Sequence, residues 1–414
     1  MKYVFFTFTL DGVTGGQRYV NNKTKWLEDK GYDVIVFDHR GGLSLNGDVV
    51  LDRLINFQDN RFLELFFPPR YFTKKQRELI INKICNKIGK ADDYVVESNS
   101  GRLALWGELV SIRLNAKHII LDVGEHPDIR SDEEYQYYSF KFERNELYLI
   151  SSKIVKTFFS GYRQISDKEA DEHMYSAIMN VVPEEVPCPE LDQLPLSDYN
   201  ILSFGREKPY FVNMINGVSE FANKHKDKRI NFIIMGVNSL SQHYLNCLNK
   251  LENLSYIIIP LKHIIPKVIF RYADAVIATA GCASISYKEG AKTISMNVET
   301  NYPLGVMGYT TINNVVDNNN ENNDVSLSSF LKRVLVDKEF EGPYILEREE
   351  TTKGYDFQIS LINNNRKYWC RVDEIVVDSG FRRYLITVFL RIGAIKLLAW
   401  LYNTKLAKLL SINV

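Results

Sequence analysis

A glycine and two basic residues directly follow an apolar run in the segment ILSFGREKPYF, which begins at Ile201. Arg206 can hold a phosphate with two parallel hydrogen bonds, and Lys208 offers a compact positive charge. A helix that begins just after them would add partial positive charge at its free N–H groups. This pattern predicts a diphosphate site, and a solvated basic turn is the alternative.

Two adjacent glycines, Gly15 and Gly16, stand between an apolar run and a helix-patterned run near the start of the chain. A backbone without Cβ atoms lets a ligand approach closely, and the start of a helix favours a phosphate or a hydroxyl-rich ligand. We therefore expect Gly15 and Gly16 to lie against such a ligand. The alternative is a glycine turn that is needed only for tight packing.

A third segment, AVIATAGCASISYKEGAKTISMN, places small residues after another apolar run. Its turn includes Gly281 and Ser284, where a phosphate could reach backbone N–H groups. Glu289 follows on the predicted helix, and a carboxylate there could accept hydrogen bonds from two ribose hydroxyls. The alternative for Glu289 is an ordinary acid on the surface of a helix.

One histidine also follows an apolar run closely. His126 lies in VGEHPDIRS, just past the run KHIILD, and a histidine there could stabilise or orient a reacting hydroxyl. His39 is placed similarly after VIVFD, so position alone does not choose between the two.

Short apolar runs alternate with helical patterns through the first half of the chain, which predicts an open α/β sheet. The predicted strands are 3–9, 32–38, 93–98, 117–122 and 153–159. The aromatic-rich residues 40–75 interrupt this alternation, and we expect an irregular or helical excursion there.

The alternation restarts after residues 183–198, which are rich in proline and acids and read as a linker. The predicted strands are 199–204, 230–236, 255–260, 275–280 and 292–297, and the predicted helices are 211–225, 239–251 and 263–274. This pattern predicts a second doubly wound domain. Because ligands bind at the carboxyl ends of such strands, two facing sheets would enclose a cleft.

Length and composition support two soluble domains and exclude some classes of partner. The 414 residues exceed the usual size of one core, and equal numbers of basic and acidic residues (51 each) argue against a nucleic-acid binder. The five scattered cysteines predict reduced thiols and neither a disulfide framework nor a zinc site. The first apolar run ends at Asp11 and reads as a buried strand, not as a signal peptide.

The tail, 381–414, is apolar and basic and contains no acidic residue. It can be a C-terminal helix packed on the protein. It can also be an amphipathic helix that lies on an anionic membrane surface, with its lysines reaching the headgroups.

Taken in order, these segments resemble the two-Rossmann-domain (GT-B) glycosyltransferases, and most of all the bacterial retaining enzymes that build surface polysaccharides. The resemblance covers roughly residues 1–340 and runs through TGGQRYVNNKTKW, ILDVGEHPD, KTFFSGYR, ILSFGREKPYF, FIIMG and the segment around Glu289. Three features depart from that family. Gly281 stands where a second glutamate is usual, and AGCASIS looks more like the inverting GT-B enzymes, so the stereochemical outcome stays open. Lys208 also lies closer to Arg206 than the lysine of that family usually does, so its role stays open.

The resemblance implies a role for each site residue. Gly15 and Gly16 would contact the donor phosphate and sugar, and His126 the transferred sugar. Arg206 and Lys208 would hold the diphosphate, with Gly281 and Ser284 also at the phosphates. Glu289 would bind the ribose, and Ile259, Pro260 and Leu261 the base. No metal and no cofactor is expected, because the nucleotide-sugar is a co-substrate and cations replace the metal.

The implied fold class is α/β, with two Rossmann-like doubly wound domains facing a central cleft and a C-terminal helical extension. The implied domains are 1–190 on the acceptor side, 198–345 for the nucleotide-sugar, a helix that crosses back at 354–380, and the basic tail at 381–414. The implied activity is sugar transfer to a glycan or lipid-linked acceptor, in the cytoplasm or on the inner membrane face. The alternatives are a nucleotide-sugar 2-epimerase and a non-catalytic assembly subunit.

Overall fold

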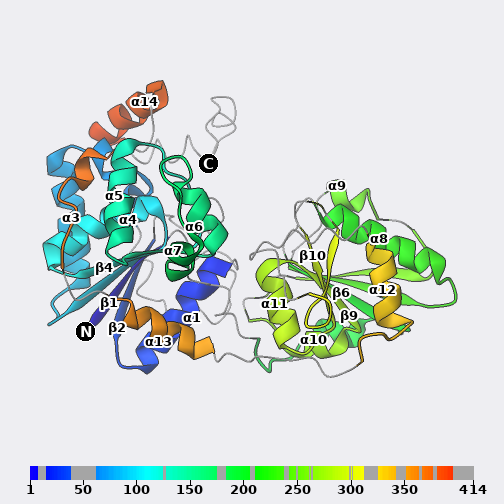
Figure 1. The fold of residues 1–414 in the computed structure, drawn as a ribbon. Coiled ribbons are helices and arrows are strands. Elements are labelled where there is room, and N and C mark those ends of the chain that lie inside the picture. The colour runs from blue at the N-terminus through cyan, green and yellow to red at the C-terminus, as the bar shows by residue number, and fades with distance from the viewer. Residues whose placement is uncertain are drawn as a thin grey trace. The chain divides into compact units, whose positions relative to one another are not determined.

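The computed structural model divides the chain into two compact units (Figure 1). The first contains Met1–Asn180 and Thr352–Val414, and the second contains Val181–Thr351. The residues described are 1–7, 15–38, 62–124, 127–174, 183–205, 210–236, 242–248, 250–260, 262, 264–297, 300, 302–311, 325–341, 351–362, 366–375 and 380–394.

The first unit is built on a five-stranded parallel sheet with the order β2-β1-β3-β4-β5. Its strands are β1 (Lys2–Thr7), β2 (Asp33–Asp38), β3 (Tyr94–Ser98), β4 (Lys117–Asp122) and β5 (Leu147–Leu149). Its helices are α1 (Gly15–Asp29), η2 (Leu63–Phe66), η3 (Pro69–Tyr71), α3 (Lys74–Ile88), α4 (Gly101–Leu114), α5 (Asp132–Glu143), α6 (Ser152–Phe159), α7 (Asp167–Glu172), α13 (Thr351–Ser360), η6 (Val372–Glu374) and α14 (Gly380–Arg391). The strand order reverses between β1 and β3, so the connections leave in opposite directions there.

Helices cover both faces of this sheet because the side chains of each strand alternate between them. Tyr3 and Phe5 of β1 pack in one core with side chains of α1 and α13. Val4 and Phe6 point to the other face and pack with α3 and α4 (Figure 1). A sheet that is buried on both faces explains why its strands read as nearly continuous apolar runs.

The second unit is built on a six-stranded sheet with the order β11-β10-β9-β6-β7-β8. Its strands are β6 (Tyr199–Phe204), β7 (Ile230–Met235), β8 (Leu254–Ile259), β9 (Ala275–Ala278), β10 (Thr293–Met296) and β11 (Pro303–Val306), of which β11 is antiparallel to β10. Its helices are η5 (Pro189–Gln193), α8 (Phe211–Lys224), α9 (Gln242–Leu245), α10 (Val268–Tyr272), α11 (Ala280–Lys288) and α12 (Leu327–Leu335). The order reverses between β6 and β9.

The two faces of this second sheet are covered by different helices. Ile201 of β6 packs in the core that includes α8 and α12, whereas the next residue, Leu202, packs with α10 and α11. Cys188 and Leu191, from the proline-rich segment predicted as a linker, are buried in the same core as Leu202. That segment is therefore packed onto the second unit over part of its length.

The fold class predicted from the sequence is confirmed, since both units are α/β with parallel sheets. The strand predicted at 153–159 is wrong, because these residues form α6. Ser151 caps the helix by accepting from the Ile154 N–H, and Val155, Phe158 and Phe159 are buried at helical spacing. The sheet edge is taken instead by β5, at Leu147–Leu149.

Other predicted elements differ mainly in length. The strands predicted at 117–122 and 199–204 are confirmed as β4 and β6. The helix predicted at 263–274 is the shorter α10, and that predicted at 239–251 is described as a helix only at α9. Of the excursion predicted at 40–75, the described part contains η2, η3 and the start of α3. All five cysteines are free, as predicted.

The first part of the tail is the helix α14, and residues 395–414 lie outside the described residues. Ile386 and Leu390 of α14 are buried in the core of the first unit with α3 and α4. No helix among the described residues is both long enough and apolar enough to span a bilayer.

A fully buried ion pair joins α1 to the first sheet. Lys23 of α1 approaches Glu97 of β3 with 2.6 Å between Nζ and Oε2, and both side chains have no exposed surface. The Tyr3 and Tyr19 hydroxyls also donate to the Glu97 carboxylate, at 2.6 and 2.8 Å. The Tyr19 hydroxyl also lies 3.0 Å from the side-chain amide oxygen of Gln358 in α13. The network therefore connects α13 to the centre of the first sheet.

Replacing Lys23 by Met keeps much of the side-chain volume but leaves the Glu97 carboxylate buried without its cation. We expect the free energy of unfolding, measured by urea denaturation, to fall by about 3–5 kcal/mol. The matched control is Arg113→Met in the exposed pair with Glu78, which we expect to cost less than about 1 kcal/mol. Equal, small effects of the two changes would contradict the structural role of the Lys23–Glu97 pair.

Candidate functional site

The carboxyl ends of four strands in the second unit form one rim. Phe204 of β6 lies in register with Met235 of β7 and with Ala278 of β9, and Met235 lies in register with Ile259 of β8. The residues that follow these positions therefore line the same edge of the sheet, namely Gly205, Gly236, Pro260 and Thr279. This is the edge at which open α/β sheets bind ligands.

Two glycines bring the backbone at this rim very close together. Gly236 has a φ of +123°, and a Cβ added to it would lie 2.2 Å from the carbonyl oxygen of Gly205. Gly205 has a φ of +146°, and a Cβ there would lie 3.7 Å from the Cys282 Sγ of α11. Only glycine adopts such conformations without strain, so both positions need it. This close approach occurs between the ends of the neighbouring strands β6 and β7.

The N-termini of α8 and α11 meet at the same rim. Tyr210, which precedes α8, is hydrogen-bonded to Thr279, which precedes α11, with 3.0 Å between the two hydroxyl oxygens. Thr279 occupies the N-cap position of α11, but its side chain does not cap the helix. The Thr279 carbonyl accepts from the Cys282 N–H of the first turn at 3.1 Å, and the partial positive charge at the start of α11 suits an anion.

The structure brings only some of the predicted residues of the second unit to this rim. Gly281 and Ser284 lie in the first two turns of α11, and Ile259 ends β8 with its side chain buried. Pro260 follows Ile259 and is exposed. Arg206, Lys208 and Leu261 lie outside the described residues, although Gly205 and Tyr210, on either side of residues 206–209, are both at the rim.

Glu289 is not brought together with Gly281 and Ser284. It lies at the C-cap of α11, and the nine residues of that helix span about 13 Å. Its carboxylate is paired with Lys267 at 3.1 Å and is only 11% exposed. The ion pair with Lys267 gives Glu289 a structural role. The contact of Glu289 with a ribose stays a prediction.

In the first unit, the predicted glycines also lie at the carboxyl edge of the sheet. Gly15 and Gly16 begin α1, and a Cβ added to Gly16 would lie 3.0 Å from Cγ2 of Val123, which directly follows β4. His126 is three positions further along that segment and lies outside the described residues. The structure therefore brings Gly16 to the segment that leads to His126.

Two carboxyl groups at this edge were not identified from the sequence. Asp122 ends β4 and accepts a hydrogen bond from the Gly124 N–H at 2.8 Å, and burial raises its pKa to about 6. Glu134, in the first turn of α5, accepts from the Arg130 N–H at 2.7 Å, and burial raises its pKa to about 7. Carboxyl groups that titrate near neutral pH can take a proton from a hydroxyl. One signal for these carboxyls is present in the sequence, namely the acid that ends the apolar run KHIILD.

Two polar oxygens at the same edge lack a partner. The Asn99 Oδ1 and Ser100 Oγ atoms follow β3 and are buried without a hydrogen-bond partner among the described residues. Ser100 is also the N-cap of α4, yet its side chain makes no capping bond. Buried oxygens are rarely left unpaired, so this place, where the strand order reverses, suits a polar ligand.

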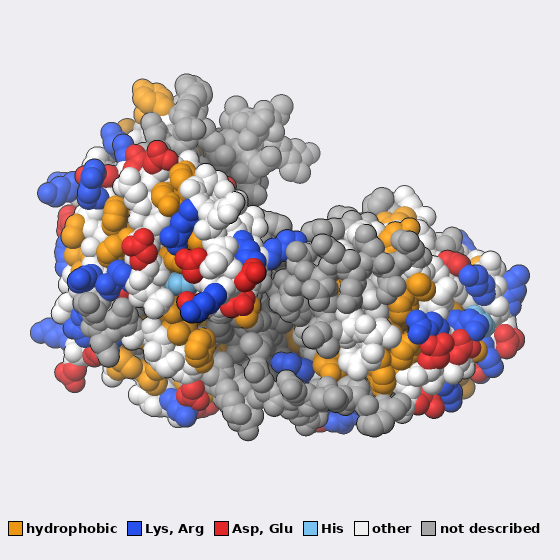
Figure 2. Space-filling model, in the orientation of Figure 1, with side chains coloured by type: hydrophobic (Ala, Val, Ile, Leu, Met, Phe, Trp, Pro, Cys, Tyr) orange, Lys and Arg blue, Asp and Glu red, His pale blue; other side chains and the backbone are white. Residues whose placement is uncertain are grey.

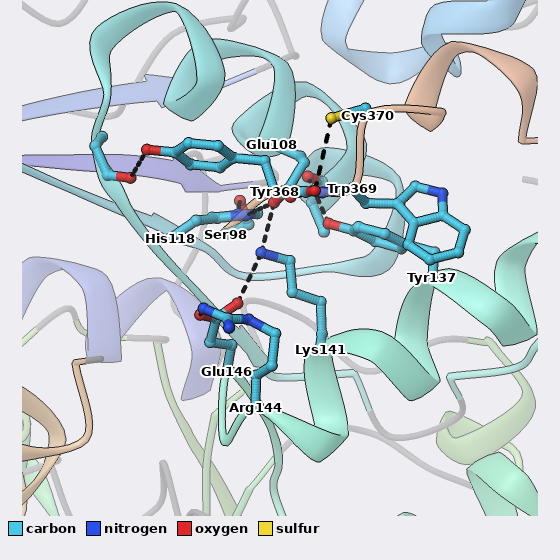
Figure 3. Close-up of polar contacts among 12 residues, drawn as sticks. Ser98, Glu108, His118, Tyr137, Lys141, Arg144, Glu146, Tyr368, Trp369 and Cys370 are labelled. Carbon is cyan, nitrogen blue, oxygen red and sulfur yellow. Dashed lines mark hydrogen bonds and ion pairs between the residues drawn. The ribbon is translucent and has the colours of Figure 1, made fainter. Parts of the chain in front are cut away.

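A separate group of side chains in the first unit has the order of a nucleophilic triad (Figure 3). The Ser98 Oγ lies 3.0 Å from the His118 Nε2, and the His118 Nδ1 lies 2.5 Å from the Glu108 Oε2. However, no substrate can reach these side chains, because those of His118 and Glu108 are at most 1% exposed and Ser98 is fully buried. The backbone of Gly107 packs directly against Ser98, since a Cβ added to Gly107 would lie 2.2 Å from the Ser98 Oγ.

This buried group is instead a structural network. The Lys141 Nζ lies 2.6 Å from Glu108, and the Trp369 N–H donates to the other Glu108 oxygen at 2.7 Å (Figure 3). Burial opposes ionisation of Glu108, but Lys141 and His118 outweigh it and lower the pKa to about 2. Burial, together with the charge of Lys141, lowers the pKa of His118. The ionised Glu108 thus anchors the segment around Trp369 to α4.

No group of three or more His, Cys, Asp or Glu side chains is arranged to hold a metal ion within the described ranges. No family model matches the sequence, and none of the curated proteins matches it. The chain is similar to the solved structure of a glycosyltransferase from Rickettsia africae ESF-5, with a TM-score of 0.53 and 15% identity over 88% of this chain and 95% of that one. A UDP-GlcNAc 2-epimerase from Neisseria meningitidis bound to UDP-GlcNAc gives a TM-score of 0.43 and 12% identity over 87% and 99%.

The likeness to the Rickettsia structure, together with the two parallel-sheet units, shows that the chain has the GT-B fold. This confirms the fold that the sequence resemblance predicted. At 15% identity the likeness concerns the fold alone.

The raised pKa of Glu134 predicts a pH dependence of stability. The carboxyl has a pKa of about 7 in the folded protein and of 4.5 as a free side chain, so the folded state is stabilised below pH 4.5 and loses that stability as the pH rises through 7. We expect Glu134→Gln to become more stable relative to wild type by about 3 kcal/mol between about pH 5 and pH 8. Urea denaturation at both pH values measures this.

Glu133→Gln is the matched control, because Glu133 is the exposed neighbour of Glu134 in the same helical turn. Its effect on unfolding should be the same at both pH values. If Glu134→Gln also shows no pH-dependent gain, the carboxyl does not titrate near neutral pH and its proposed environment is wrong.

At the rim of the second unit, Gly236 has no space for a side chain, so we expect any side chain there to lower the stability of the fold. Gly236→Ala must relieve both an unfavourable φ and the contact with the Gly205 carbonyl, and we expect it to lose roughly 2–3 kcal/mol or more of unfolding free energy. Gly161→Ala is the control, because a Cβ there would contact nothing. Comparable urea midpoints for the two variants would contradict the described rim.

Proposed function

We propose that the protein transfers a sugar from a nucleotide-sugar donor to a glycan or lipid-linked acceptor in the synthesis of cell-surface polysaccharide. It would act in the cytoplasm or as a peripheral protein on the inner face of the cell membrane. The observation that carries the proposal is the rim of the second unit, where the N-termini of α8 and α11 meet through Tyr210 and Thr279 at a reversal of strand order. The GT-B fold is the context in which this rim is interpreted.

In this proposal the diphosphate of the donor lies at the first turn of α11, with Gly281 and Ser284 beside it. Arg206 and Lys208 belong to the short connection between β6 and α8 and would stabilise the negative charge of the departing nucleoside diphosphate. These two cations would take the part that a metal ion plays in other enzymes. Backbone groups at Ile259, Pro260 and Leu261 would contact the base at the end of β8.

The first unit would supply the chemistry at the acceptor. Gly16 lies against Val123 at the start of α1, and His126 follows Val123 by three positions in the sequence. Asp122 and Glu134 add two carboxyls whose pKa values burial raises to about 6 and about 7. One of them in its ionised form could accept the proton that an attacking hydroxyl loses.

Thermal-shift measurements with UDP-, GDP-, ADP- and dTDP-sugars test the donor site, because a ligand that binds the folded state raises the melting temperature. We expect one nucleotide class to stabilise the protein, and Arg206→Ala and Lys208→Ala each to weaken that binding by about tenfold or more. The control is Arg229→Ala, an exposed arginine just before β7, at the opposite edge of the second sheet from the rim.

Turnover assays then separate the possible activities. Release of nucleoside diphosphate that depends on an acceptor supports sugar transfer, whereas an altered donor sugar formed without any acceptor would identify an epimerase. Binding without turnover would favour a non-catalytic subunit. If no nucleotide-sugar raises the melting temperature, the proposal fails.

A further inference from the structure

A basic pocket opens on the first unit, built by segments that are far apart in the sequence. It has a volume of about 560 Å³ and lies between η3, the start of α3, η6 and the end of α14. Four basic side chains line it, namely Arg70, Lys74, Arg77 and Arg391. The only carboxylate among its lining residues is Glu374. Such a set favours an anionic ligand.

Two of the arginines of the pocket are held by backbone carbonyls. Arg70 donates to the backbone carbonyl of Glu374, and Arg77 donates to the carbonyl of Phe72 at 2.8 Å. The Glu374 carboxylate itself accepts from the Arg371 Nε at 2.6 Å. In the part of the chain that the structure describes, no acidic side chain forms an ion pair with Arg70, Lys74 or Arg391.

An exposed apolar stripe runs along the helix that closes the pocket. Tyr384 and Val388 of α14, and Ile392 directly after its end, are 64%, 39% and 71% exposed and follow one another at four-residue spacing. The opposite side of the helix is packed into the core through Ile386 and Leu390. Figure 2 shows hydrophobic side chains at the surface where α14 lies in Figure 1, with Lys and Arg side chains on the same face of the unit.

The stripe and the pocket are parts of one surface. Arg391, on the last turn of α14, lines the pocket and lies between Val388 and Ile392 in the sequence. The Gln76 side chain of α3 donates to the Leu390 carbonyl at 2.9 Å, so the end of α14 is fastened to the helix that carries Lys74 and Arg77. Apolar side chains beside a cluster of cations are typical of surfaces that lie in the headgroup region of a membrane.

We propose that this surface docks on an anionic phospholipid membrane. The phosphate of a lipid headgroup would occupy the pocket among Arg70, Lys74, Arg77 and Arg391, while Tyr384, Val388 and Ile392 insert among the upper parts of the acyl chains. A soluble protein partner would not need four cations gathered in one pocket, and a free phosphate would not need the apolar stripe. The proposal does not depend on sugar transfer, and it differs from a membrane contact made by residues 395–414.

Sedimentation of the full chain with lipid vesicles tests this proposal. We expect binding to vesicles of phosphatidylcholine with phosphatidylglycerol, and little binding to phosphatidylcholine alone. The double variant Lys74→Ala/Arg391→Ala should bind the anionic vesicles about tenfold more weakly, because each of its two substitutions removes one surface cation. Val388→Ser/Ile392→Ser should also weaken binding, and its loss should persist at high salt because the contact that it removes is apolar.

The matched control is Lys224→Ala/Arg229→Ala, which removes two exposed cations from the second unit. Unchanged melting temperatures and circular dichroism confirm that each variant is folded. All variants retain residues 395–414, so unchanged binding by Lys74→Ala/Arg391→Ala would assign membrane contact to residues 395–414 and overturn the proposal. Stabilisation by inorganic phosphate without any vesicle binding would assign the pocket to a soluble anion and also overturn it.

Discussion

The cost of burying charge is the constraint on which the first unit depends. Glu97 and Glu108 are both fully buried, and each is surrounded by a lysine and several hydrogen-bond donors. A buried carboxylate is tolerated only when its charge and lone pairs are matched, because removing it from water costs several kcal/mol. Both networks draw a partner from the C-terminal part of the chain. Gln358 contacts the Glu97 network through Tyr19, and the Trp369 N–H donates a hydrogen bond to the Glu108 carboxylate. The chain returns to the first unit after it has formed the second. This returning segment therefore supplies hydrogen-bond partners to the buried groups of the first unit.

The same constraint separates polar groups that hold the fold from those that can meet a ligand. Ser98, His118 and Glu108 have the spacing of a catalytic triad, but they are closed off by Gly107 and their polar atoms are matched within the protein. At the carboxyl edge of the same sheet, by contrast, Asn99 and Ser100 have unpaired oxygens, and burial raises the pKa of Asp122.

The second unit uses backbone geometry in place of buried charge. Its cores on the two faces of the sheet are apolar, and the features of its rim come from glycines and helix N-termini. A site that depends on backbone conformation can be kept while most side chains change.

The sequence by itself determined the α/β class, the two parallel sheets and the position of the glycine-rich connections, because buried strands and amphipathic helices leave a local pattern in the chain. It misassigned 153–159, where apolar residues at helical spacing looked like a strand, and it gave no sign that Lys267 would pair with Glu289. Only the tertiary structure decided which polar residues are closed in and which stand at an edge. It alone brought Arg70, Lys74 and Arg391 to one pocket, because contacts between segments 300 residues apart in the chain have no local signature. Burial and pairing are properties of the packed fold, and these decide what each charged residue does.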